Sequence, residues 1–161
     1  MGEHVYMDSD KLRSDDTIEK PLLNSTLSIG FVGLAECLIS LIGEHHGQSQ
    51  KAQQLGYLII SHLRAMTDKY TKEEHLNWST FSSPAENCAG RLCKLTQKKY
   101  GKIHGVTDKE YFTNSSHIPV NYKISFADKI KLEAPYHPLC NAGKLNAKYK
   151  INFKKNFNKL I

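Results

Sequence analysis

The sequence lacks any apolar run long enough to cross a lipid bilayer, which takes roughly 20 consecutive residues in a helix. Its longest apolar stretch, residues 29–42, is interrupted by Gly30, Gly33, Glu36 and Ser40. Residues 1–20 are polar and acidic, and they contain no apolar segment of the kind that a secretory signal peptide requires. These absences predict a soluble, cytoplasmic protein without a membrane partner.

The spacings of cysteine that bind zinc are absent as well. None of the four cysteines forms a C-x-x-C pair, and Cys88 and Cys93 are too widely spaced for a usual zinc half-site. No metal site is therefore predicted. Cys37, Cys88 and Cys93 lie in apolar helical contexts, where a free thiol usually packs in the core as a small apolar side chain.

Acidic residues are missing from the last 18 residues, 144–161, which contain six lysines. The formal net charge is +6, from 22 basic and 16 acidic residues, so without those six lysines the basic residues number 16 and balance the acidic ones. A basic tail with Phe153, Phe157 and Leu160 on one helical face is typical of membrane-surface or nucleic-acid binding. Its narrow composition instead favours a frameshift in an A/T-rich gene, and we expect no nucleic-acid partner.

The sequence does contain alternating strand and helix patterns. Residues 26–29 predict a short strand that turns through Gly30 and Gly33 into a helix ending near Ile42, apolar on nearly all sides and therefore buried. Residues 50–68 predict an amphipathic helix, and residues 76–81, 120–124 and 130–132 predict strands. The stripe expected to face the core in the second helix is Leu55, Leu58, Ile59, His62 and Met66. This alternation favours a single α/β domain over an all-helical one.

A further helix is predicted to begin at Ser83-Pro84-Ala85-Glu86, immediately after a strand. Ser83 and Glu86 have the spacing of a capping box, in which the two side chains satisfy the free amides of the first turn. Such amides also bind phosphate, although the Glu86 carboxylate would occupy the same positive end unless it turned away, and the spacing leaves both interpretations open. The predicted buried stripe is Ala85, Cys88, Leu92 and Leu95.

Two other patterns favour ordinary structural roles. The spacing of Gly30 and Gly33 does not match a dinucleotide-binding fingerprint, so close helix packing explains these glycines better. His45 and His46 are adjacent, and neighbouring side chains point apart, so a solvated pair is predicted rather than a metal site.

Six segments, in order along the chain, resemble signatures of the anaerobic (class III) ribonucleoside-triphosphate reductases. They are TLSIGFVGLAE (26–36), GEHHG (43–47), SPAENCAGR (83–91), GVTDKEY (105–111), TNSSHIPV (113–120) and PYHPLCNAG (135–143). The resemblance implies three parts: a polar lead-in over residues 1–20, a barrel fragment over 21–143 and an unrelated Lys/Asn-rich tail over 144–161. It identifies the chain as part of the catalytic subunit.

The resemblance implies an incomplete ten-stranded α/β barrel of the glycyl-radical type. In that family a thiyl radical, generated from a glycyl radical, abstracts hydrogen from the ribose of a ribonucleoside triphosphate. The finger-loop cysteine, the radical glycine, the structural zinc site and the regulatory nucleotide-binding domain are all expected outside this chain. No catalytic residue is expected in it. The implied partners are the nucleotide substrate, an S-adenosylmethionine iron-sulfur activating enzyme and a second copy of the subunit.

The segment at residues 83–91 resembles the turn that holds substrate phosphates in this superfamily. The implied phosphate-binding residues are Ser83, Ala85, Glu86, Asn87 and Cys88. Three functions follow as hypotheses: a reductase fragment that is inactive alone, a nucleotide- or polyanion-binding module without catalysis, and one part of a split reductase.

Overall fold

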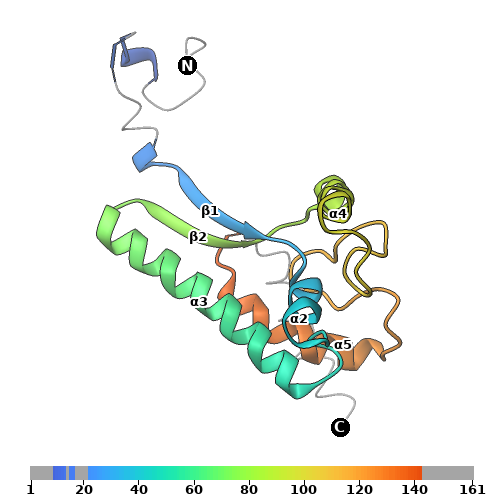
Figure 1. The fold of residues 1–161 in the computed structure, drawn as a ribbon. Coiled ribbons are helices and arrows are strands. Elements are labelled where there is room, and N and C mark those ends of the chain that lie inside the picture. Colours follow the sequence, from blue (N-terminus) through green and yellow to red (C-terminus); the bar gives the residue numbers. More distant parts are fainter. Residues whose placement is uncertain (1–8, 14, 17–21, 143–161) are drawn as a thin grey trace.

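The structure is a computed structural model that describes residues 9–13, 15–16 and 22–142 (Figure 1). Its strands are β1 (Thr26–Phe31) and β2 (Asn77–Ser82). Its α-helices are α2 (Leu34–Ile42), α3 (Gln50–Glu74), α4 (Glu86–Tyr100) and α5 (Phe126–Glu133), and its 3-10 helices are η1 (Ser9–Lys11) and η2 (Ala134–Leu139). None of the described helices is long and apolar enough to span a membrane.

β1 and β2 form a parallel two-stranded sheet, with Thr26 opposite Asn77 and Phe31 opposite Ser82. Parallel neighbours need a crossover connection, and α2 and α3 supply it. This parallel sheet with its helical crossover confirms the predicted α/β class. The ten-stranded barrel stays a prediction, because the described part of the chain contains one sheet of two strands.

α3 covers one face of the sheet (Figure 1). The hydroxyls of Thr67 and Thr80 lie 3.1 Å apart, and the Thr71 hydroxyl donates to the Trp78 carbonyl at 3.2 Å. Because side chains alternate along a strand, the residues on either side of Thr80 point to the opposite face. That face carries the hydroxyl of Ser79.

The core lies where α2, α3 and η2 meet. Its buried members are Leu34, Leu38, Ile60, Tyr136 and Cys140. Gly56 of α3 lies at the centre, where an added Cβ would approach the Tyr136 hydroxyl to 2.6 Å and Leu38 to 3.2 Å. The absence of a side chain at Gly56 therefore allows η2 and α2 to pack against α3.

The predicted core stripe of α3 is partly wrong. Leu58 is 64% exposed and His62 is also exposed, whereas the buried positions are Ala52, Gly56, Ile60 and Thr67. Leu55 and Ile59 pack at the margin of the core. The smallest side chains face inward because they admit the bulky residues of α2 and η2.

The expectation that the helix ending at Ile42 is buried on all sides is also wrong, since Leu41 is 62% exposed and Cys37 is exposed. Only the side of α2 with Leu34, Ala35 and Leu38 reaches the core. Its end is as predicted, because Gly43 terminates it in the left-handed conformation at φ 82°.

The strands predicted at 120–124 and 130–132 are not formed. Residues 120–124 form a turn and coil in which Val120 is 81% exposed, and Ile130 and Leu132 lie in α5. Ser125 starts this helix, because its hydroxyl accepts a hydrogen bond from the Asp128 amide at 3.1 Å. An N-cap of this kind outweighs two alternating apolar residues in so short a segment.

Candidate functional site

Two helices begin at the carboxyl ends of the parallel strands. β1 leads through Gly33 into α2, and β2 leads through residues 83–85 into α4 (Figure 1). In parallel sheets, ligands bind beyond the carboxyl ends of the strands, and helix amino ends attract anions there. These two helix starts are therefore the candidate sites for an anionic ligand.

The amino end of α2 is already occupied by protein groups. The Gly33 amide donates to the Thr113 carbonyl at 2.8 Å, and the Leu34 amide donates to the Ser115 carbonyl at 3.2 Å. Glu36, in the first turn, is only 3% exposed and places a carboxylate at the positive end of the helix. An external anion would have to displace this carboxylate.

The amino end of α4 is open by comparison. Ala85 is its N-cap, none of the described side chains caps it, and the first intrahelical bond runs from the Ala89 amide to the Ala85 carbonyl at 2.7 Å. The amides of residues 86–88 thus have no acceptor within the helix. Asn87 and Cys88 are exposed, so a ligand can reach this turn from solvent.

The predicted capping box is wrong, because α4 begins three residues beyond Ser83. Ser83 has a different contact: its carbonyl accepts a hydrogen bond from the Ser115 hydroxyl at 2.7 Å. The peptide that leads into α4 is therefore held by a loop distant in sequence rather than by its own helix.

The predicted buried stripe of α4 is also wrong, because a different face of the helix points inward. Cys88, Leu92 and Leu95 are exposed, and Ala89 and Cys93 are buried instead. The Cys93 thiol donates to the Lys109 carbonyl at 3.2 Å, and burial raises the pKa of this thiol despite the opposing charge of Lys109. Of the cysteines predicted to pack in the core, Cys93 does so, whereas Cys37 and Cys88 do not.

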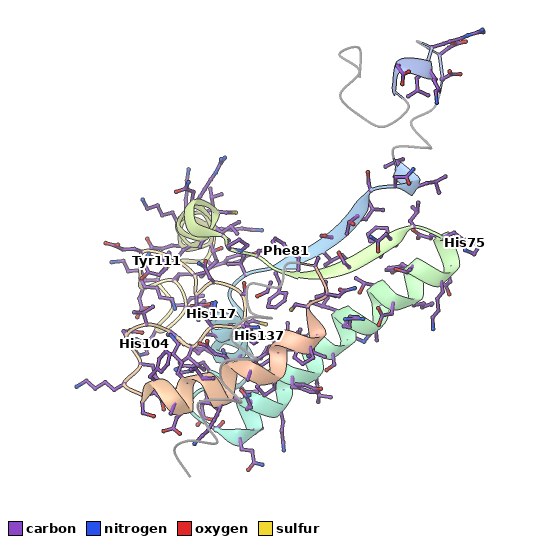
Figure 2. All side chains as sticks on the ribbon, turned by 180° about the vertical axis from the view of Figure 1, so that it is seen from behind. His75, Phe81, His104, Tyr111, His117 and His137 are labelled. Atoms are coloured by element: carbon purple, nitrogen blue, oxygen red, sulfur yellow. The ribbon has the colours of Figure 1, made fainter. Side chains whose placement is uncertain are left out.

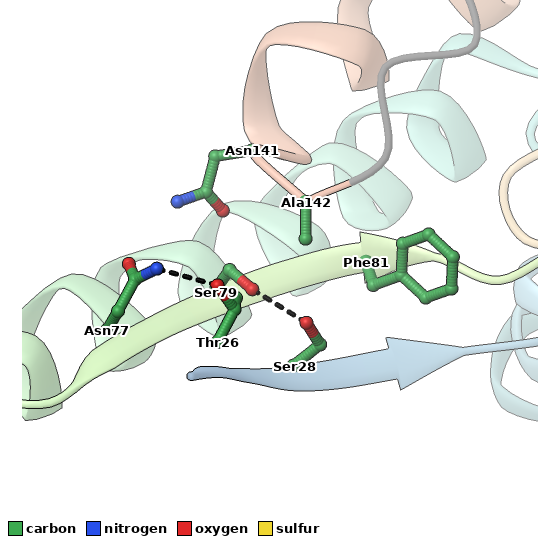
Figure 3. A pocket seen from close by; sticks show the side chains of 7 residues that line it. All are labelled: Thr26, Ser28, Asn77, Ser79, Phe81, Asn141 and Ala142. Atoms are coloured by element: carbon green, nitrogen blue, oxygen red, sulfur yellow. Dashed lines mark hydrogen bonds between the residues drawn. The ribbon is translucent and has the colours of Figure 1, made fainter. Parts of the chain in front are cut away.

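A polar hollow of about 510 Å³ lies on the face of the sheet opposite α3 (Figure 3). Two hydrogen-bonded pairs cross the strands there: Asn77 donates to the Thr26 hydroxyl at 2.7 Å, and the Ser28 and Ser79 hydroxyls lie 2.8 Å apart. Phe81, Asn141 and Ala142 complete the lining. Side chains that can bond a hydroxylated or amide-bearing ligand thus line this face.

Gly30 joins this hollow to the start of α4. It lies opposite Phe81 in the sheet register, and a Cβ added at Gly30 would collide with the Ser83 hydroxyl oxygen. The Ser83 side chain therefore occupies the space over Gly30. Gly30 lies within β1 and makes room for Ser83, whereas Gly33 starts α2 with φ 79°, so close helix packing explains neither position.

The predicted solvated histidine pair is wrong. His45 and His46 are 5% and 0% exposed, because the chain near Ser116 and Tyr122 packs over them. The His46 Nε2 lies 2.9 Å from the Ser116 carbonyl, and the His45 Nδ1 accepts from the Gly47 amide at 3.0 Å. Burial, with smaller effects of His46 and Lys109, lowers the pKa of His45 to about 4. Burial also lowers the pKa of His46.

Metal-ligating side chains do not gather elsewhere in the part of the chain that the structure describes, where no three His, Cys, Asp or Glu residues are grouped. His104 pairs with Asp108 and His117 pairs with Glu133, and His75 lies at the far end of α3 from both (Figure 2). The basic tail at residues 144–161 lies outside the described residues.

A cluster around Glu36 is not among the features predicted from the sequence. Its Oε1 accepts hydrogen bonds from the Thr113 amide at 3.0 Å and the Thr113 hydroxyl at 2.7 Å, and it pairs closely with the Lys109 ammonium group. The available signal was a carboxylate within an otherwise apolar helix, since a buried charge needs partners.

Comparisons with known proteins identify the family of this chain. The profile of the family described as anaerobic ribonucleoside-triphosphate reductase matches residues 1–157. Over 136 residues the chain is 38% identical to the anaerobic ribonucleoside-triphosphate reductase of Salmonella typhimurium and 37% identical to that of Escherichia coli. It is 35% identical over 138 residues to the enzyme of the same name from Enterobacteria phage T4.

These alignments cover 83–84% of this chain but only 19–21% of each relative. The chain thus spans about a fifth of the length of the curated relatives that it matches. The chain belongs to the anaerobic ribonucleoside-triphosphate reductase family.

Proposed function

We propose that this chain is the part of an anaerobic ribonucleoside-triphosphate reductase that holds the substrate phosphates, at the start of α4. The observation that carries the proposal is the contrast between two helix amino ends at one edge of the sheet. The end of α2 is filled by Glu36 and by loop carbonyls that accept from its first amides, whereas no described loop carbonyl accepts from the first amides of α4.

In this proposal the donors are the Ser83 hydroxyl and the backbone amides of residues 85–88. Phosphate oxygens are strong acceptors, and the partial positive charge of a helix amino end favours them. Asn87 and Cys88 contribute through their amides, and their exposure keeps the turn accessible. Glu86 belongs to the same turn and contributes its backbone amide.

The polar hollow supports a position for the nucleoside part of the substrate. Ser83 lies over Gly30 at one end of the face that carries Ser28 and Ser79. A triphosphate bound at α4 would place its nucleoside along this face, where hydroxyl and carboxamide groups can bond the sugar. Phe81 offers a ring against which a base can pack.

The reduction itself is assigned to the whole enzyme. We propose that this chain forms part of a ten-stranded barrel, in a cytoplasmic homodimer that an activating enzyme loads with a glycyl radical. A structural zinc does not fit the four cysteines described here, since no three potential ligands are grouped, and we assign it to another part of the reductase. We predict that the isolated chain does not reduce nucleotides.

The test is a titration of the 15N-labelled full chain with ATP, followed by amide chemical shifts. Binding at α4 should move the amides of residues 86–88 first, and tripolyphosphate should move the same amides. A chain ending at residue 143 should bind with the same affinity, because the tail is not part of the site. Unmoved amides at residues 86–88 would contradict the proposal.

Two other functions have distinct outcomes in this experiment. The six lysines of residues 144–161 favour a polyanion-binding module, which would lose affinity without the tail and at high salt. A split reductase would recover nucleotide reduction when this chain is mixed with a polypeptide carrying the remaining parts.

A further inference from the structure

We infer that Glu36 is a positioning residue for the phosphate-binding turn: it fixes the loop at residues 109–116, which in turn holds the peptide of Ser83 at the entrance to α4. The inference rests on the proposed function of that turn. It gives a role to a buried carboxylate that lies outside the turn itself.

Glu36 is bound to the loop by three contacts on one oxygen. Its Oε1 accepts from the Thr113 amide and the Thr113 hydroxyl, and it pairs with the Lys109 ammonium group. Burying a carboxylate that is 3% exposed costs free energy unless such donors compensate for the loss of water. The loop therefore supplies what Glu36 requires, and Glu36 fixes where the loop lies.

The same loop is fixed a second time on the backbone of α2. The Thr113 and Ser115 carbonyls accept hydrogen bonds from the Gly33 and Leu34 amides. Ser115 adopts φ 46°, a left-handed conformation that a serine rarely takes. Such a conformation persists where the surrounding contacts determine it, and these contacts surround Ser115.

From Ser115 the contact passes to the phosphate-binding turn. The Ser115 hydroxyl donates to the Ser83 carbonyl at 2.7 Å, and this carbonyl belongs to the peptide that joins Ser83 to Pro84. The loop also reaches α4 directly, through the Phe112 amide and the Ala89 carbonyl at 3.3 Å. Glu36 thus connects the filled helix end to the open one through a single loop.

The second carboxylate oxygen is informative for the choice of variants. The Glu36 Oε2 is buried and has no hydrogen-bond partner among the residues that the structure describes. In Glu36→Gln the side-chain carbonyl can replace Oε1 and keep both Thr113 bonds, while the charge opposite Lys109 is lost and an NH2 group takes the place of Oε2. Glu36→Ala removes every contact with the loop. The glutamine variant should therefore restore most of what the alanine variant loses.

The experiment compares four variants of the full chain with the wild type: Glu36→Ala, Glu36→Gln, Ser115→Ala and the combined Glu36→Ala/Ser115→Ala. Glu73→Gln is the matched control, because Glu73 is an exposed glutamate of α3 in an ion pair with Lys69. The readouts are the Kd for ATP and for tripolyphosphate, hydrogen exchange at the Thr113 amide, and the amide shifts of Ser83 and Cys88 without ligand.

We expect Glu36→Ala to weaken the binding of ATP and of tripolyphosphate by about tenfold. The Thr113 amide should exchange faster, and the amide shifts of Ser83 and Cys88 should change. Glu73→Gln should change none of these readouts. Ser115→Ala, which leaves the Glu36 contacts in place, should weaken binding similarly. The combined variant should bind no more weakly than the weaker single variant, because the two residues act in series.

Three results would overturn the inference. They are wild-type affinity in Glu36→Ala, multiplied losses in the combined variant, and equal losses in Glu36→Gln and Glu36→Ala. If the wild type binds neither ligand, the proposed function fails, and the ligand-free shifts still decide the connection. Unmoved Ser83 and Cys88 amides in folded Glu36→Ala would refute it, and moved ones would support it.

Discussion

Mild acid is expected to destabilise this fold through its two buried histidines. His45 is 5% exposed, and its Nδ1 accepts a hydrogen bond from the Gly47 amide, which a protonated ring cannot do. The ring also packs edge-on against Tyr122, with 4.7 Å between ring centroids. Protonation would therefore remove a hydrogen bond and bury a charge beside His46 and Lys109.

The magnitude follows from the shift in pKa. The folded pKa of His45 is about 4, compared with an ordinary value of 6.5, so below pH 6.5 the unfolded chain binds a proton that the folded chain does not. Stability is thus fully present above about pH 6.5 and is lost as the pH falls toward about 4. Between about pH 7.5 and 5.5, His45 alone should cost about 1.3 kcal/mol. His46, whose pKa is also lowered, adds to this loss.

The assay is urea unfolding of the full chain at a series of pH values in this range, which lies above the ordinary pKa of carboxylates. His45→Asn can keep the bond from Gly47 through its amide oxygen but cannot be protonated, so it should flatten the pH dependence by the share of His45. His62→Asn, at an exposed position of α3, is the matched control and should not change it. A His45 ring that titrates near 6.5 by NMR, or an unchanged slope in His45→Asn, would refute the reasoning.

The remaining predictions concern glycines and caps. Gly56→Ala should destabilise the fold by about 1–2 kcal/mol in thermal unfolding, because the clash with the Tyr136 hydroxyl outweighs the gain of about 1 kcal/mol in helix propensity; a rise in Tm would contradict this. Gly30→Ala should weaken ATP binding several-fold while shifting Tm little, because the new Cβ turns the Ser83 hydroxyl away; unchanged affinity would argue against a role for that hydroxyl. Ser49→Ala should lower the free energy of unfolding by about 1 kcal/mol, because the Ser49 hydroxyl caps α3. Ser83→Ala should leave the free energy of unfolding unchanged and lower only the affinity for ATP, because Ser83 does not cap α4. Equal losses of stability in the two variants would show that Ser83 caps α4 after all.

Elements with a strong local pattern could be predicted from the sequence. β1, β2 and the first two helices all occur close to the expected residues, and Gly43 ends α2 as expected. Which face of each helix is buried could not be predicted, because it depends on which distant segments of the chain pack against the helix. In α3 the inward position of Gly56 is set by Tyr136, a residue 80 positions later in the chain.

The strand-to-helix turn that carries the candidate site was predicted in place, but the first residue of its helix was not. The change from strand to helix at Ser83 is visible in the sequence, and the resemblance to the reductases adds the phosphate role. The hydrogen bond from the Ser115 hydroxyl to the Ser83 carbonyl is not visible in the sequence, and in the structure α4 begins at Glu86 rather than directly after Ser83. Glu36 and Thr113, 77 residues apart, have no local signal that would pair them.

Contacts between residues distant in sequence also explain why the burial of the two histidines was not predicted. His45 and His46 look like a solvated pair beside Glu44 and Gly47, yet the partner of His46 is the carbonyl of Ser116, 70 residues away. Burial of a polar pair depends on such distant partners, which satisfy the groups that leave water.

The most direct test of the central claim is the site of triphosphate binding on the full chain. Titration of the 15N-labelled protein with ATP and with tripolyphosphate should move the backbone amides of residues 86–88 in both cases, with equal affinity in a chain ending at residue 143. If those amides stay in place, or if binding requires residues 144–161 and disappears with salt, the start of α4 is not the phosphate-binding turn.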